Sequence, residues 1–64
     1  MSGRVNVRYG LNQGDRLMVT RGKEKKKATV VKEYSFHILV DWGKYKSSVN
    51  KADVYTGDVR LARI

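Results

Sequence analysis

Glycines divide this sequence into short segments, and that spacing constrains the fold more than any other feature. The glycines that mark turns are Gly10, Gly14, Gly22, Gly43 and Gly57. Between them apolar and polar residues alternate with the period of half-buried strands, and no segment has the period of an amphipathic helix. Closing short strands into a barrel removes the open edges that a small sheet would expose. The pattern therefore predicts an all-β fold, a small barrel of about five or six strands.

The expected strands follow the alternation from one turn signal to the next. In order, they cover residues 4–9, 16–21, 28–34, 37–42, 45–50 and 59–64. We expect the charged residues 22–27 to form a loop, and residues 51–54 to form a single turn of 3₁₀ helix. The 45–50 strand is expected near a sheet edge, because lysines discourage unwanted pairing there.

The domain organisation expected from this reading is one barrel with a short extension. Residues 14–64 form the barrel, and residues 1–13 form either a basic N-terminal arm or an extra strand. Both alternatives stay open, because residues 4–9 alternate like a strand and chain termini fray unless something holds them.

A thin core is expected, because a chain this short buries little of its surface. The expected core residues are Leu17, Val19, Val30, Ile38, Val40, Val49, Val54 and Leu61. Val30 and Val31 are adjacent, which leaves the inward phase of their strand open. Among the aromatic residues, Tyr34 and Trp42 are expected to be buried, whereas Phe36 and Tyr45 lie next to turns and are expected to be exposed.

The charge is strongly one-sided. Fourteen lysines and arginines stand against six acidic residues, which gives a net charge of +8. Solubility alone needs a magnitude of about 2 to 8, and a basic surface attracts polyanions and releases their counterions. The candidate partners are nucleic acid, an acidic protein and an anionic membrane. The membrane is the weakest of the three, because no amphipathic helix is present to insert an apolar face.

Two stretches of the sequence resemble known small domains. Residues 14–23, Gly-Asp-Arg-Leu-Met-Val-Thr-Arg-Gly-Lys, resemble the start of a KOW motif, and residues 38–43, Ile-Leu-Val-Asp-Trp-Gly, resemble a Tudor domain. The resemblance implies a Src homology 3-like barrel. In a Tudor-like barrel it also implies that Trp42 and Tyr45 lie near an aromatic cage for methylated lysine or arginine. A surface with a net charge of +8 would repel the basic peptides that carry those groups.

We therefore expect a nucleic-acid-binding module in which lysines contact phosphates and exposed aromatic rings stack on bases. No recognition helix is visible, so little sequence specificity is expected, and RNA and DNA both stay open. The candidate binding residues are Arg21, Lys23, Lys25, Lys26, Lys27, Phe36, Trp42, Lys44, Tyr45 and Lys46.

The second hypothesis is a protein-interaction adaptor or inhibitor, of the kind that phages and mobile elements encode, that binds an acidic protein. An enzyme is not expected: His37 and Asp41 share one strand face, but no nucleophile or glycine-rich phosphate cradle accompanies them. Neither a cofactor nor a metal is expected, because one histidine without any cysteine cannot build a zinc site.

The sequence also favours a location and an assembly state. No apolar run approaches the roughly 18 residues of a membrane helix, and the first residues lead into no signal-peptide core. We expect a cytoplasmic protein that is a monomer or a homodimer.

Overall fold

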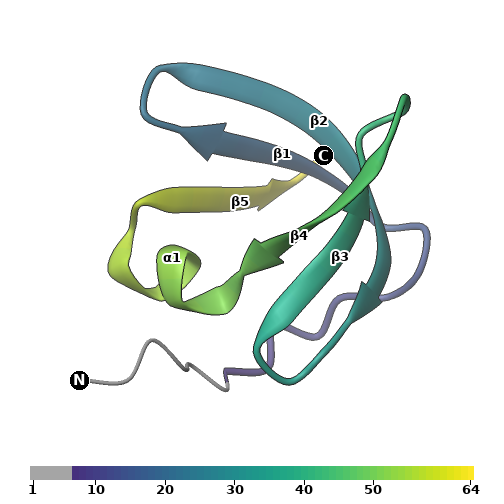
Figure 1. The fold of residues 1–64 in the computed structure, drawn as a ribbon, viewed down its shortest axis with the longest axis horizontal. Coiled ribbons are helices and arrows are strands. Elements are labelled where there is room, and N and C mark those ends of the chain that lie inside the picture. The colour runs from purple at the N-terminus through teal and green to yellow at the C-terminus, as the bar shows by residue number, and fades with distance from the viewer. Residues whose placement is uncertain (1–6) are drawn as a thin grey trace.

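The computed structural model describes residues 7–64 and contains five strands and one short helix (Figure 1). They are β1 (Arg16–Arg21), β2 (Glu24–Glu33), β3 (His37–Asp41), β4 (Lys46–Asn50), α1 (Lys51–Thr56) and β5 (Val59–Arg63). The strands form one antiparallel sheet in the order β4-β3-β2-β1-β5. The strongly curved sheet wraps around its own inner face, and α1 bridges β4 and β5 (Figure 1). This confirms the predicted all-β, barrel-like class.

The structure describes only residues 7–13 of the N-terminal segment, for which a basic arm and an extra strand were the two alternatives. The first three residues of the expected strand over residues 4–9 lie outside the described residues, and its last three, 7–9, do not belong to a strand. The predicted position of β4 at a sheet edge is confirmed by the strand order.

Two local predictions were wrong. The charged residues 22–27 do not form a loop: the turn is limited to Gly22 and Lys23, and β2 begins at Glu24, opposite Arg21. Every residue of β1 is paired with a residue of β2, so β2 extends through the charged run. Residues 51–54 belong to an α-helix, not to a 3₁₀ turn. Asn50 caps it by accepting from the Ala52 amide, and Gly57 ends it at a φ of 90°.

A bulge in β2 settles the inward phase that Val30 and Val31 left open. Val30 pairs with Val40, but the register then shifts, and Lys32 pairs with Leu39. The extra residue reverses the alternation. Val30 points inward before the bulge, and Glu33, opposite the buried Ile38, points inward after it. A polar side chain thus reaches the inner face of the sheet.

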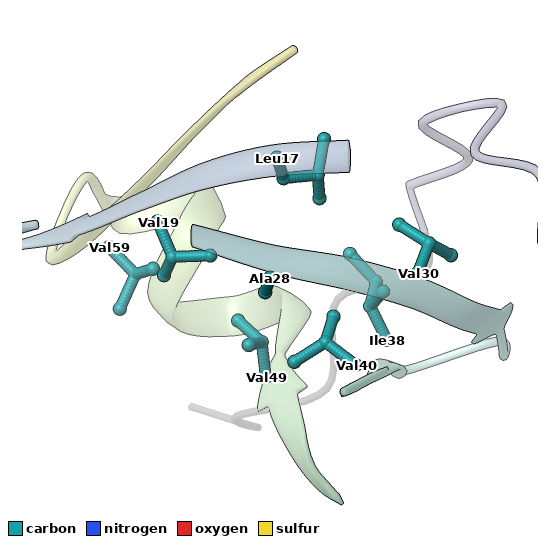
Figure 2. Packing of buried hydrophobic residues seen from close by; sticks show 8 residues of the cluster. All are labelled: Leu17, Val19, Ala28, Val30, Ile38, Val40, Val49 and Val59. Carbon is teal, nitrogen blue, oxygen red and sulfur yellow. The ribbon is translucent and has the colours of Figure 1, made fainter. Parts of the chain in front are cut away.

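The core lies on the inner face of the curved sheet, where side chains from every strand meet (Figure 2). It consists of Leu17, Val19, Ala28, Val30, Ile38, Val40, Val49 and Val59. The predicted residues Val54 and Leu61 are only half-buried at its margin, whereas Ala28 and Val59 were missed. Val59 shares the inward phase of β5 with Leu61, and it becomes buried where α1 packs against β5.

The predictions for the burial of the aromatic side chains are also partly right and partly wrong. Phe36 and Tyr45 are exposed, as expected, with exposed fractions of 41% and 57%. Trp42 is half-buried against the core. Tyr34 was expected to be buried, and that is wrong: it is 40% exposed. The bulge turns Tyr34 to the outer face, where its ring stacks on that of His37 at 4.7 Å between centroids.

Candidate nucleic-acid interface

Two hairpin turns lie in the upper half of Figure 1, the first at the upper left and the second at the upper right. One joins β1 to β2, and the other, at Gly43 and Lys44, joins β3 to β4. Between them lies an open hollow of about 210 Å³ whose lining includes Arg21, Glu24, Lys26, Trp42, Tyr45 and Ser47. A neighbouring hollow shares Lys26, Trp42 and Tyr45 and adds Lys27 and Lys44. We call the two together the hairpin groove.

The length of β2 explains why charged residues line this groove. Thr29 pairs with Asp41, the last residue of β3, so the first residues of β2 extend past the end of that strand. Side chains alternate between the two faces of a strand. Because Ala28 faces the core, Lys26 and Glu24 share its face, and Lys26 stands opposite the buried Val19. The inner face of the sheet therefore changes from apolar to charged as it leaves the core.

The aromatic wall of the groove is held in place by a tight hairpin. The Trp42 amide donates to the Tyr45 carbonyl at 2.9 Å. Between these residues Gly43 has a φ of 104°, a conformation that favours glycine. The Asp41 carboxylate accepts from the Gly43 amide at 2.8 Å. The turn therefore places the two aromatic residues directly opposite each other.

The two rings differ in freedom and exposure. The Trp42 indole Nε1 donates to Ser47 Oγ at 2.6 Å, which fixes the orientation of the ring. The Tyr45 ring lies 6.5 Å from it between centroids, tilted by 34°. Trp42 is half-buried and Tyr45 is mostly exposed. The pair therefore consists of a fixed ring and a solvent-facing ring that can accept a planar ligand.

Within residues 7–64, no ion pair neutralises the charges of the groove. Over residues 7–64 the ion pairs are Lys51–Glu33 at 2.7 Å and Arg63–Asp15 at 3.8 Å, and neither lies in the hairpin groove. Arg21, Lys26, Lys27 and Lys44 therefore line it without a carboxylate partner. Among the described residues Glu24 is the only acid of the lining. This end of the barrel has the positive field that an anionic ligand requires.

The structure brings together part of the predicted binding set. Arg21, Lys26, Lys27, Trp42, Lys44 and Tyr45 line the groove. Lys23 lies in the β1–β2 turn at the same end but not in the lining, and Lys25 stands opposite Thr20 on the outer face. Lys46 stands opposite Asp41, also on the outer face.

Phe36 is the predicted residue that lies farthest from the others. It precedes β3, whereas Trp42 follows that strand, which separates them by about 20 Å at roughly 3.3 Å per residue. The two aromatic residues therefore cannot contact one base.

Sequence reasoning missed Glu24 and Ser47 as members of this site. Continuing the alternation backward from Ala28 would have placed Lys26 and Glu24 on the inner face. That signal was lost because the charged run was interpreted as a loop. The bond from Trp42 to Ser47 lies within one hairpin, but it depends on the position of the turn between them.

The opposite end of the barrel holds a buried ion pair instead of an open groove. Lys51, 2% exposed, donates to Glu33 at 2.7 Å. The same carboxylate accepts from the Tyr9 amide at 2.8 Å and from the Leu11 amide at 2.9 Å. Burial by itself raises the pKa of Glu33. The hydrogen bonds and the charge of Lys51 have a larger combined effect in the opposite direction, so the pKa falls from 4.5 to about 2. Glu33 thus ties the segment before β1 to the barrel as an ionised carboxylate.

The residues weighed for other chemistry do not assemble. His37 stacks on Tyr34, while Asp41 accepts from the Gly43 amide. In the described part of the chain, no three metal-binding side chains gather at one place. That part also contains no helix that is long and apolar enough to cross a membrane.

No family model matches the sequence, and searches of curated proteins and of solved structures find no significant match. What the protein does must therefore be inferred from the groove itself.

Proposed function

We propose that this protein is a nucleic-acid-binding module, without catalytic activity, that holds its ligand in the hairpin groove. One observation supports this most strongly. A mostly exposed tyrosine, Tyr45, stands beside Trp42 in a hollow lined by cations that have no ion-pair partner in the described chain. A phosphate backbone supplies the missing negative charge, and a base supplies the planar group that stacks on the ring.

The binding mechanism combines two contributions. Lys26, Lys27 and Lys44 contact phosphates and displace counterions, which makes the affinity depend on salt. Tyr45 stacks on a base, a contact worth about 1–3 kcal/mol. Because bases in a duplex are stacked and paired, single strands of RNA or DNA fit this arrangement better than duplex DNA does. Phosphate contacts and stacking on a base discriminate little between nucleotide sequences.

The proposal includes the resemblance to KOW and Tudor domains. The five-stranded antiparallel sheet is compatible with a Src homology 3-like barrel. In this chain, residues next to the turn at Gly22 and residues of the turn at Gly43 line the same hairpin groove. Several unpaired cations favour a polyanion in that surface over a methylated, positively charged side chain.

The test is the binding of purified, nuclease-treated protein to labelled single-stranded RNA, single-stranded DNA and duplex DNA across a salt series. The decisive pair of variants is Lys26→Glu and Lys25→Glu. Both make the same change in net charge at neighbouring positions of β2, but Lys26 lines the groove and Lys25 lies on the outer face. We expect Lys26→Glu to reduce affinity at least about tenfold more than Lys25→Glu, because only Lys26 contacts the ligand directly.

Each outcome separates this proposal from its rival. Equal loss in the two variants would mean that net charge, not the groove, attracts the nucleic acid. If none of the three nucleic acids binds at physiological salt, the proposed function is wrong. The basic surface would then serve an acidic protein partner, whose complex should survive nuclease treatment.

A further inference from the structure

Glu24 is an anomaly in a site built for a polyanion. It is the first residue of β2 and lines the groove together with Lys26. Although Arg21 stands opposite it in the register, the two form no ion pair, and the described chain provides Glu24 with no other. Glu24 is exposed to solvent, and no ion pair within residues 7–64 holds its carboxylate, which is therefore available to a ligand in the groove. A carboxylate repels phosphates, so it weakens the contact that the surrounding lysines make.

A carboxylate in this position can accept hydrogen bonds from the edge of a base. In RNA the 2′-hydroxyl is a second donor, but it is the same in every nucleotide and gives no base preference. An ionised carboxylate is an acceptor with two oxygens. Guanine presents two adjacent donors, N1–H and the N2 amino group, on the edge that is free in a single strand. Cytosine and adenine each present one amino group there, and uracil presents a single N–H between two carbonyl oxygens that repel a carboxylate.

The hollow that contains Glu24 is smaller than a pocket for a drug-sized ligand and has an aromatic wall. Pockets for drug-sized ligands occupy about 300–1,000 Å³, and the hollow that contains Glu24 occupies about 210 Å³. Tyr45 and Trp42 form its aromatic wall, and their tilt of 34° leaves no parallel slot between the rings. Tyr45 and Glu24 line the same hollow, so a base stacked on the exposed face of Tyr45 can direct its edge toward the start of β2.

We propose that Glu24 makes the hairpin groove selective for an unpaired guanine, by accepting hydrogen bonds from its N1–H and N2 amino groups while the base stacks on Tyr45. This inference rests on the proposed nucleic-acid binding and adds a base preference to it. The lysines set the affinity for any strand, and Glu24 penalises bases that cannot donate to it.

The experiment measures the binding of labelled eight-nucleotide RNAs by fluorescence anisotropy. Each RNA carries uracil at every position except a central one, which is guanine, adenine, cytosine or uracil, and a DNA series is prepared in the same way with thymine. For the unaltered protein we expect the guanine-containing strand to bind about tenfold more tightly than the all-uracil strand. The Glu24→Gln variant should lose that preference while binding all four strands at least as tightly as the unaltered protein binds uracil, because a repulsive charge is gone.

A matched control is the Asp53→Asn variant. It removes the same charge from α1, outside the groove, and should keep the guanine preference. Circular dichroism melting curves verify that both variants are folded.

The outcomes distinguish this inference from the proposed function. Equal affinity of the unaltered protein for all four strands would overturn the guanine preference and leave nucleic-acid binding intact. A preference that persists in Glu24→Gln would overturn the role of Glu24, as would a folded Glu24→Gln variant that binds none of the strands. If the unaltered protein binds no strand of either series, both proposals are wrong.

Discussion

The two ends of this barrel treat charge in opposite ways. At one end, Glu33 and Lys51 are buried together, and the carboxylate also accepts two backbone hydrogen bonds. Throughout the described residues, no buried side-chain nitrogen or oxygen lacks a partner. At the other end, the hairpin groove is lined by cations and a carboxylate that form no ion pair with any of residues 7–64.

The difference separates charges that hold the fold together from charges that remain available for a ligand. A buried pair contributes little net stability over an apolar substitute, but removing one partner is costly because the other charge stays buried. An exposed charge can be removed with little effect on folding. Substitutions at the two ends should therefore have distinct effects, on stability at one end and on binding at the other.

The largest effect is expected from matched carboxylate deletions at the two ends. Glu33→Ala leaves the Lys51 ammonium and two backbone amides without their acceptor, and should lower the free energy of unfolding by about 3–5 kcal/mol. Glu24→Ala should change it by no more than about 0.5 kcal/mol. Urea denaturation measures both.

A domain of this size has only about 3–10 kcal/mol of stability in total, so a loss at the upper end of the expected range leaves Glu33→Ala largely unfolded. Glu33→Gln then provides the comparison, because its amide oxygen can still accept a hydrogen bond. Similar unfolding curves for the Glu33 and Glu24 variants would show that the two ends do not differ.

A smaller, pH-dependent effect should come from the same carboxylate. In the folded protein the pKa of Glu33 is about 2, below its ordinary value of 4.5. Folding therefore favours the ionised form. The stabilisation is complete above pH about 4.5 and is lost as the pH falls toward 2. Thermal melting over this range should show the stability advantage of the unaltered protein over Glu33→Gln shrinking as the pH falls. An advantage that stays constant would contradict the lowered pKa.

Stacking can be tested with two exposed tyrosines. Tyr45→Ala removes the ring of the hairpin groove and should weaken single-strand binding by about 1–3 kcal/mol. Tyr55→Ala removes a ring that is 70% exposed on α1, outside the groove, and should leave binding unchanged. Fluorescence anisotropy at fixed salt measures both affinities. Equal losses would place the nucleic acid outside the groove.

The smallest effect concerns single phosphate contacts. Each contact with a single strand contributes about 0.7 to the slope of log affinity against log salt. Lys26→Ala should lower that slope by about this amount, whereas Lys23→Ala, in the turn and outside the lining, should leave it unchanged. An equal reduction of the slope in both variants would mean that the binding surface also includes the tip of the β1–β2 hairpin.

The candidate site shows how far sequence reasoning reached. The positive charge, the exposure of Tyr45 and the turn at Gly43 were predictable, because composition and turn chemistry are local properties. The convergence of Lys26 with Tyr45 was not, because it depends on how far β2 extends past the end of β3. The role of Lys51 also escaped the sequence analysis, since Lys51 begins α1 and its buried partner, Glu33, ends β2.

The sequence by itself determined the all-β class, most of the strands and a core that includes Leu17, Ile38 and Val40. The spacing of glycines and the alternation of apolar residues encode these features locally. Only the tertiary structure decided which way Glu33 and Tyr34 point, because the bulge in β2 reverses their alternation. A bulge forms where pairing with a neighbouring strand favours it, so its position depends on two strands at once and cannot be read from either strand alone.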